Sequence, residues 1–346
     1  MSRAPHLSEF AARLAALGAK PSHVRRIFRA WMGLCPWEAK ASLHFPQPVE
    51  EALPALRREL EGLSRALYVP SAATRGSAKL IVELSDGECV ESVLLSRQGL
   101  CVSTQVGCAV GCLFCQTGRG GLIRQLSSAE IIAQVREAMK LRPGGVKKVV
   151  FMGMGEPSHN AAAVCEAVEF LGDIAGLAHK DIVVSTVGDP KFIRRLGALR
   201  VKPALALSLH TTDDALRRKL LPKSPAVPAA ELLRIAQDYA CETKYPVQIE
   251  WTLIKGVNDS IEEARRLESM LEPERAMVNY IAVNPIEGRP FERPEGAHMQ
   301  SLITVQRRSG KNIVATVRES AAQDVEGGCG QLRARVLRNR RIGTER

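Results

Sequence analysis

The sequence lacks any run of about 18 apolar residues, the length that a helix needs to cross a bilayer. Its first twenty residues, MSRAPHLSEFAARLAALGAK, lack both the continuous apolar stretch and the cleavage site of a secretory signal. The nine cysteines are an odd number, which suits a reducing compartment better than a framework of disulfides. We therefore expect no membrane partner and a cytoplasmic location.

Acidic residues are too few to balance the basic ones. There are 48 Lys and Arg against 37 Asp and Glu, which gives a formal charge of +11 at pH 7. Excess positive charge attracts polyanions, and RNA is the natural candidate. A merely soluble basic protein remains the alternative, because charge alone does not distinguish the two. The 346 residues, 45% of them hydrophobic, can form one large domain and a smaller one.

Four of the nine cysteines fall within Gly99–Cys115, GLCVSTQVGCAVGCLFC. Three of them have the spacing C-x3-C-x2-C: Cys108, Cys112 and Cys115. The preceding apolar residues 100–104 predict a short buried strand, so the three thiols follow a strand end, where α/β folds place their chemistry. Gly107 and Gly111 let the backbone wrap closely around a bulky group.

Three thiols at this spacing favour an iron–sulfur cluster. Cysteine thiolates hold such clusters, and three ligands leave one iron of a four-iron cluster open, as in catalytic metal sites. Zinc usually takes four ligands, and no histidine lies within thirty residues of this group on either side. Buried structural cysteines are common, but three within eight residues on a glycine-containing loop are hard to explain as core.

Further motifs follow in a fixed order. They are Cys101-Val-Ser-Thr-Gln-Val-Gly-Cys108, Gly153-Met-Gly-Glu-Pro157, Ser208-Leu209-His210, Val283-Asn284-Pro285 and Cys329-Gly330-Gln331-Leu332. Together they resemble the RlmN/Cfr family, radical-SAM enzymes that methylate an adenine carbon in RNA. The resemblance covers roughly residues 80–332 and is looser at the N-terminus.

The resemblance implies two cofactors, a [4Fe-4S] cluster on Cys108, Cys112 and Cys115, and S-adenosylmethionine (SAM). The SAM contacts that it implies are Gly155, Glu156, Ser185, Ser208, Leu209, His210 and Asn284. It also implies an rRNA or tRNA substrate and an electron donor such as flavodoxin or ferredoxin. Without the resemblance, Gly155-Glu156 would read as a turn and His210 as a structural residue.

Three catalytic residues are implied in the same way. Cys329 would become an S-methylcysteine whose methylene is added to an adenine ring carbon, with carbon 2 preferred and carbon 8 as the alternative. Cys101 would be the resolving thiol, which forms a transient disulfide with Cys329. Glu91 would accept the ring proton; composition alone favours an exposed strand residue, and only the resemblance points to this role. The other four cysteines read as structural.

Two alternatives remain at this point. A radical-SAM enzyme acting on a different substrate would keep the cluster but would not need Cys101 or Cys329. A non-enzymatic iron–sulfur regulator that binds RNA would need neither a SAM pocket nor a second reactive cysteine.

The expected fold is α/β, a partial (β/α)6 radical-SAM barrel with a small N-terminal helical domain. Residues 1–70 read as helical and RNA-binding, and 78–346 as the catalytic domain with a C-terminal cysteine loop and a basic tail from Arg333. A hairpin is expected at 78–84 and 89–95, and a last strand at 312–318. The repeating strands are expected at 100–104, 147–152, 181–186, 203–208, 247–254 and 277–283. The helices between them are expected at 127–141, 160–174, 190–199, 212–219, 229–243, 259–271 and 296–308. Six βα repeats predict a parallel sheet.

Overall fold

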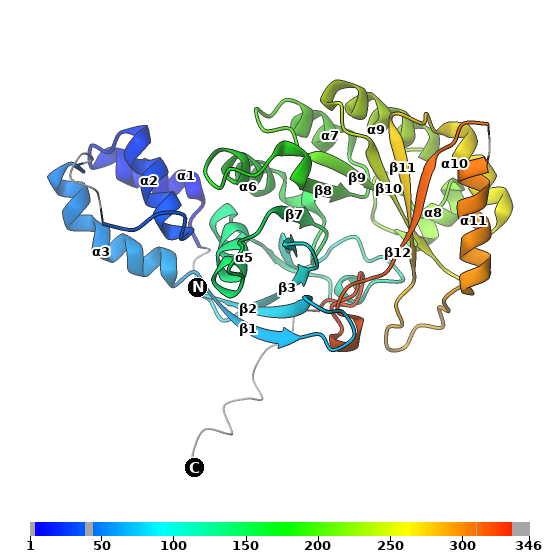
Figure 1. Ribbon diagram of the computed structural model, residues 1–346, viewed down its shortest axis with the longest axis horizontal. Coiled ribbons are helices and arrows are strands. Elements are labelled where there is room, and N and C mark those ends of the chain that lie inside the picture. The colour runs from blue at the N-terminus through cyan, green and yellow to red at the C-terminus, as the bar shows by residue number, and fades with distance from the viewer. Residues whose placement is uncertain (1–3, 39–43, 309, 334–346) are drawn as a thin grey trace, which may run out of the picture.

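A ten-stranded mixed sheet organises the chain in the computed structural model, which describes residues 4–38, 44–308 and 310–333 (Figure 1). In chain order its strands are β1 (Ser64–Pro70), β2 (Ala78–Leu84), β3 (Cys89–Leu95), β4 (Gly99–Cys101), β7 (Lys148–Phe151), β8 (Ile182–Thr186), β9 (Ala204–Ser208), β10 (Val247–Leu253), β11 (Ala276–Ala282) and β12 (Val314–Arg318). The strands lie side by side in this same order. The sheet is antiparallel from β1 to β4 and parallel from β4 to β12.

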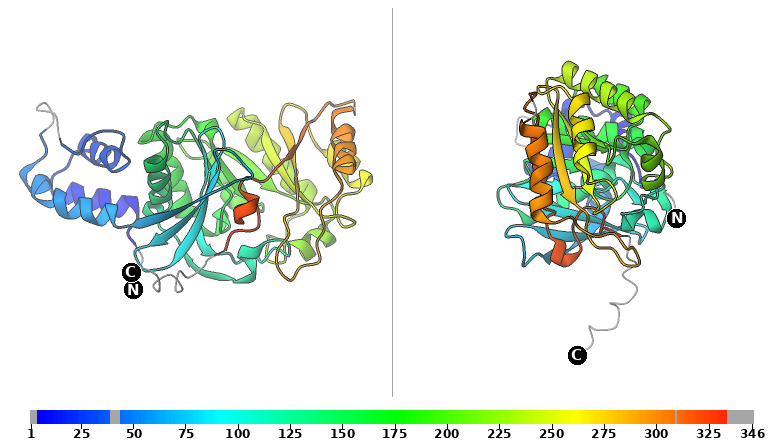
Figure 2. Two further views of the ribbon diagram at one scale, coloured as in Figure 1. Left: turned by 60° about the horizontal axis from the view of Figure 1, so that its bottom comes forward. Right: turned by 90° about the vertical axis from the view of Figure 1, so that its right-hand side faces the viewer.

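Helices connect the parallel strands and cover the outside of the sheet (Figures 1 and 2). They are α5 (Ser128–Leu141), α6 (Ala161–Asp173), α7 (Pro190–Gly197), α8 (Asp214–Leu220), α9 (Ala229–Thr243), α10 (Ile261–Met270) and α11 (Gly296–Arg308). Parallel strands are buried on both faces, which explains why all five residues of β8 are buried. The α/β class and the βα repeats are confirmed. The sheet has two ends, β1 and β12, and is therefore open.

The N-terminal unit consists of α1 (Leu7–Ala16), α2 (Pro21–Trp31) and α3 (Gln47–Glu61). It stands at one end of the molecule (Figure 1) and packs against α6. Phe28 and Phe170 meet edge to face with ring centroids 5.4 Å apart, and Arg29 donates to the Ile174 carbonyl at 2.8 Å. The unit therefore shares a hydrophobic core with the rest of the chain.

The structure differs from the sequence expectation at two places. Ser64–Pro70, expected within the helical unit, forms β1 and pairs with β2 along its whole length. The expected strand 100–104 ends at Cys101, because the chain then turns to form a separate two-stranded sheet of β5 (Gln105–Gly107) and β6 (Leu122–Gln125).

The chain after β12 runs back across the molecule to the first strands (Figure 2). Its short helix η3 (Gln323–Val325) carries Asp324, whose carboxylate accepts the Ser71 hydroxyl at 2.6 Å and the Ala72 amide at 2.7 Å. The other short helices are α4 (Gln116–Arg119), η1 (Pro157–Asn160) and η2 (His179–Asp181). The basic tail expected beyond Arg333 lies outside the described residues. Across the described parts of the chain, no helix has the length and apolarity that a membrane crossing requires.

Candidate active site

The loop that carries the three closely spaced cysteines is closed at its base by β5 and β6. Cys108 donates its amide to the Gly121 carbonyl at 2.9 Å. Gly107 has a φ of +82°, and a Cβ atom there would lie 2.0 Å from the same carbonyl oxygen. Only glycine fits this position, so the sequence Gly107-Cys108 fixes where the loop begins.

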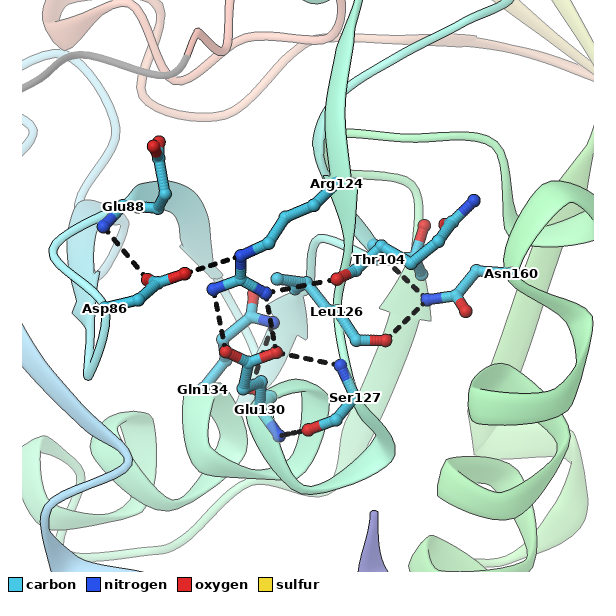
Figure 3. A network of polar contacts seen from close by, with 10 residues as sticks. Asp86, Glu88, Thr104, Arg124, Leu126, Ser127, Glu130, Gln134 and Asn160 are labelled. Atoms are coloured by element: carbon cyan, nitrogen blue, oxygen red, sulfur yellow. Dashed lines mark hydrogen bonds and ion pairs between the residues drawn. The ribbon is translucent and has the colours of Figure 1, made fainter. Parts of the chain in front are cut away.

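A polar network holds the closing strand β6 in place (Figure 3). Arg124 forms a two-pronged ion pair with Glu130, at 2.9 Å for each bond, and its Nε lies 2.7 Å from Asp86. Glu130 also accepts the Ser127 amide, and Ser127 caps the start of α5 in return. The network therefore ties the base of the cysteine loop to α5 and to the β2–β3 turn.

Cys108, Cys112 and Cys115 are half-buried and pack with Val110, Phe114 and other apolar side chains. Burial raises the pKa of Cys108 to about 12 and that of Cys112 well above its ordinary value, and the neighbouring thiols raise both further. Thiolates in such a place require a bound cation. Within the described ranges, no three metal-binding side chains are placed to hold a single ion. Ligands of a four-iron cluster bind different iron atoms and stand further apart than the ligands of one ion, so the three thiols fit such a cluster.

A cavity of about 160 Å³, partly open to solvent, adjoins this loop at the carboxyl ends of the parallel strands. The predicted site residues that line it are Cys108, Cys112, Cys115, Gly155, Glu156, Ser185, Ser208, His210, Asn284 and Cys329. They come from segments spread over the chain from β5 to the C-terminal loop. The structure thus brings together both the expected cluster ligands and six of the seven expected SAM contacts.

Leu209 is the exception among the expected SAM contacts. It is fully buried in the main hydrophobic core and does not line the cavity. Side chains alternate along a strand, so Ser208 faces the cavity and Leu209 faces away from it. Leu209 therefore offers no side chain to the cavity, and its backbone amide donates to the Glu250 carbonyl at 3.1 Å.

Glu156 is held firmly at the wall of the cavity. Its carboxylate accepts the Thr186 hydroxyl at 2.6 Å, the Ser158 amide at 3.0 Å and the Val187 amide at 3.1 Å. Hydrogen bonds to the charged form stabilise a carboxylate. A fixed negative charge at this point can grip an ammonium group.

His210 is held in its neutral form. Its Nδ1 accepts the Thr252 amide at 2.9 Å, which leaves the proton on Nε2. Burial, and next the positive charge of Arg217, lower the pKa of His210 to about 3. The residue has a φ of +67°, so its backbone is in the left-handed region, and its ring stacks edge-on against Phe114 with centroids 4.9 Å apart. His210 therefore joins the cysteine loop to the end of β9.

Asn284 has an unused polar atom. Its Nδ2 donates to the Ser320 hydroxyl and to the Cys329 carbonyl, both at 2.9 Å. Its Oδ1 is buried and accepts no hydrogen bond from the described residues. A buried acceptor without a partner costs free energy unless a ligand supplies a donor. Asn284 thus fits a ligand that carries hydroxyl or amino groups, such as an adenosyl group.

Cys329 lies in a loop that is docked on the cysteine loop. The Gln116 amide donates to the Gly330 carbonyl at 2.6 Å, and the Thr117 hydroxyl donates to the Leu332 carbonyl at 2.6 Å. The Cys329 side chain is exposed because it faces the open cavity, yet the cavity walls desolvate its thiol and raise its pKa. Burial, and next the nearby Cys329, raise the pKa of Cys101 to about 12. The two thiols are therefore electrostatic neighbours although they are 228 residues apart, 329 minus 101.

Glu91 lies behind this loop and does not line the cavity. It is 1% exposed; its carboxylate lies 3.4 Å from the Lys79 ammonium and accepts the Arg333 amide at 2.9 Å. The strand β3 that carries Glu91 pairs with β4, which carries Cys101. The C-terminal segment thus contacts the Glu91 carboxylate directly, through the Arg333 amide.

Two charged residues near the cavity had no sequence signal. Glu250 on β10 lines the cavity, and burial raises its pKa. Arg318 on β12 lies 3.2 Å from the Glu250 carboxylate, and its positive charge partly offsets the rise in the pKa of Cys101 and of Cys329. Each is a single charged residue in an apolar strand, and only the pairing of β10, β11 and β12 brings them together.

Known proteins resemble this chain along nearly its whole length. The model of the radical SAM superfamily matches residues 102–267, which include the three cysteines. A probable RNA methyltransferase of Azoarcus sp. strain BH72 is 52% identical over 344 residues, 98% of each chain. A probable RNA methyltransferase of Pseudomonas aeruginosa strain PAO1 is 50% identical over 329 residues, 94% of each chain. A crystal structure of a radical SAM methyltransferase from Sphaerobacter thermophilus superposes with a TM-score of 0.81 at 33% identity, covering 95% of this chain and 98% of the other.

The fold and the cysteine-lined cavity define a radical SAM enzyme, and the chain belongs to that superfamily. Within it, the chain belongs to the family of these probable RNA methyltransferases. Its cofactors are accordingly a [4Fe-4S] cluster and SAM.

Proposed function

We propose that this chain methylates an adenine ring carbon, carbon 2 rather than carbon 8, in rRNA or tRNA through an S-methylcysteine at Cys329. The relatives named as probable RNA methyltransferases and the net charge of +11 support an RNA substrate. The observation that carries the mechanism is the position of Cys329. It is a fourth thiol that faces the same cavity as the three cluster ligands.

Cys108, Cys112 and Cys115 would hold the cluster, and Glu156, Ser185, Ser208, His210 and Asn284 would hold SAM. When bound there, the cluster and SAM would supply a carbon radical through reductive cleavage of SAM. Such a radical is needed because ordinary methyl transfer from SAM does not reach an electrophilic ring carbon. Glu156 would fix the amino end of SAM, and the free Oδ1 of Asn284 would accept a hydrogen bond from its adenosyl end.

Cys329 would carry the methyl group and form the bond to the adenine through that carbon. Cys101 would then attack the Cys329 sulfur as a thiolate. The sulfur–carbon bond breaks with its electron pair going to the methylene carbon, which takes up a proton to become the methyl group, and a disulfide is left to be reduced. Glu91 would accept the ring proton, which requires the segment at Arg333 to move off its carboxylate. A reactive base must leave its stack to reach a cavity of this kind.

The two other readings of the sequence are less well supported. A regulator without enzymatic activity would not need a cavity in which SAM-binding residues and a second thiol converge. A radical SAM enzyme acting on another substrate would not need Cys329 beside Cys101.

The test is nucleoside analysis of rRNA and tRNA after incubation with the reconstituted enzyme, SAM and a reductant. We expect 2-methyladenosine from the wild-type enzyme and none from Cys329→Ala. The control variant is Cys241→Ala, which alters an exposed cysteine with no assigned role. Methylated RNA from Cys329→Ala at the wild-type level would overturn the proposal.

A further inference from the structure

The outer side of the cysteine loop is covered by the end of α8 and the turn that follows it. Leu113 donates its amide to the Leu220 carbonyl at 3.0 Å, and Lys223 donates its amide to the Val110 carbonyl at 3.2 Å. Leu113 is the neighbour of Cys112, and Val110 lies between Cys108 and Cys112. The segment from Leu220 to Lys223 is therefore hydrogen-bonded directly to the backbone that carries the cluster ligands.

The last turn of α8 and the segment that follows it present three exposed cations, Arg218, Lys219 and Lys223, which we call the basic patch. None of the three forms an ion pair with any other described residue of the chain. The acidic residues of α8 lie at its opposite end, where Asp213 caps the helix and Asp214 accepts the Ala229 amide at 2.7 Å. The exposed charged side chains that α8 itself carries at the end nearest the cluster loop are thus basic, although the charge of Lys219 also acts on Asp213.

We propose that the basic patch is the docking site for a small acidic one-electron carrier that holds a flavin or an iron–sulfur group. The inference rests on the radical SAM chemistry of the proposed function and adds the place where its electron enters. One electron leaves the reduced carrier, which is oxidised, and reduces the cluster held by Cys108, Cys112 and Cys115. No proton or other co-reactant is needed for this step.

The placement of the patch favours a carrier over RNA. Electron transfer requires the two redox groups to be close, and the patch lies on the wall that directly covers the cluster loop. RNA, in contrast, must reach Cys329, which belongs to the C-terminal loop docked on α4. Exposed cations without partners steer an acidic protein to the surface, and they set association rate and orientation more than affinity.

The test compares two reductants on the full-length reconstituted enzyme. Dithionite is a small ion that needs no docking site, whereas flavodoxin, kept reduced by its reductase, is an acidic carrier of the proposed class. The variant Arg218→Glu/Lys219→Glu/Lys223→Glu should raise the flavodoxin concentration at half-maximal formation of 5′-deoxyadenosine by about tenfold or more. Its dithionite-driven rate should stay at the wild-type level.

The control variant is Lys180→Glu/Arg194→Glu/Arg265→Glu, which changes the net charge equally at three exposed cations of η2, α7 and α10. It should keep the wild-type flavodoxin dependence. The milder variant Arg218→Gln/Lys219→Gln/Lys223→Gln serves if the charge reversal impairs folding, and an intermediate effect is expected.

A second readout does not depend on turnover. Carbodiimide cross-linking joins lysines to carboxylates in contact, so flavodoxin should cross-link to Lys219 or Lys223, as mapped by mass spectrometry. Cross-links only at other lysines, or an unchanged flavodoxin dependence in the patch variant, would overturn the docking site. Weaker binding of tRNA or rRNA by the patch variant, with normal flavodoxin dependence, would assign the patch to RNA instead. If the wild-type enzyme fails to cleave SAM with dithionite, the proposed function itself fails.

Discussion

Cys101 and Cys329 come from distant parts of the chain, and Cys329 raises the pKa of Cys101; the proposed chemistry depends on the pairing of these two thiols. Both pKa values are raised, for Cys101 first by burial and then by the other thiol. Raised pKa values keep the two groups as thiols at neutral pH, and thiols are slow to form a disulfide prematurely.

Cys101→Ala removes the proposed resolving thiol. We expect a covalent protein–RNA adduct to accumulate, because the bond between the Cys329 sulfur and the substrate is then not broken. The adduct should be visible as a nuclease-sensitive shift on a denaturing gel. Cys165→Ala, which changes a buried cysteine in α6, should give none. Free product release from Cys101→Ala would contradict the role of Cys101.

Glu91 and Glu250 are two buried carboxylates near the reactive thiols, and only Glu250 lines the cavity. Glu91→Gln should lower RNA methylation by about 100-fold, since a general base typically contributes about 10²–10⁴-fold. Cys329 should still become methylated in this variant, because the proton is removed from RNA later. Comparison with Glu250→Gln gives the decisive control. If only Glu250→Gln lost RNA methylation while its Cys329 was still methylated, Glu250 and not Glu91 would be the proton acceptor.

His210 predicts a pH dependence of stability. Its pKa is about 3 in the folded chain and 6.5 when unfolded, so the unfolded chain binds the proton more tightly between these values. The contribution of neutral His210 to the free energy of unfolding is complete above pH 6.5 and is lost as the pH falls. The free energy of unfolding should drop by about 2 kcal/mol between pH 7 and pH 5 from this residue alone.

The measurement is denaturant unfolding of the reduced, cluster-free protein at both pH values. His210→Asn is the control, because Asn tolerates a positive φ and its Oδ1 can accept the Thr252 amide but does not titrate. An equal drop in both proteins would refute the assignment.

The sequence motifs pointed to most of the predicted site residues that line the cavity. Ser208 and His210 line the cavity while Leu209 is buried in the core, because the motif carries no information on which side chain of a strand faces inward. Glu250 and Arg318 were missed since their meeting depends on strand register, which a sequence pattern does not specify.

At the level of secondary structure, most helices and strands between residues 127 and 318 agree with the sequence patterns within a few residues. Periodic apolar residues and a capping box such as Ser127 with Glu130 give strong local signals. β1 was missed because its residues alternate between half-buried and exposed, and its stability comes from pairing with β2. Short pieces such as β5 and β6 likewise depend on contacts distant in sequence.

The network around Arg124 should decide the stability of the strand that closes the cysteine loop. Arg124→Gln leaves Glu130 fully buried without its cation and should cost about 3–5 kcal/mol of unfolding free energy. Arg234→Gln breaks an exposed pair with Asp238 and should cost less than about 0.5 kcal/mol. Denaturant unfolding measures both, and cluster content should fall in Arg124→Gln. Equal costs for the two variants would show that the network is not structural support.

Across the whole molecule, the charge of +11 predicts RNA binding that weakens with salt. Truncation after Arg333 removes five arginines and should lower both RNA affinity and the slope of log affinity against log salt. The slope should fall by about 0.9 or less for each phosphate that the shortened chain no longer neutralises. SAM cleavage in the absence of RNA should be unaffected. The measurement is fluorescence anisotropy with labelled tRNA over a salt series, and an unchanged affinity and slope would exclude a role for this tail.

The central claim is that Cys329 becomes methylated in a cluster-dependent reaction. The most direct measurement is mass spectrometry of the tryptic peptide Glu319–Arg333 from protein expressed with an intact cluster, beside Cys108→Ala. We predict a peptide one methyl group heavier at Cys329 in the wild-type chain and an unmodified peptide in Cys108→Ala. An unmodified wild-type peptide, even after incubation with SAM and a reductant, would contradict the methylcysteine mechanism.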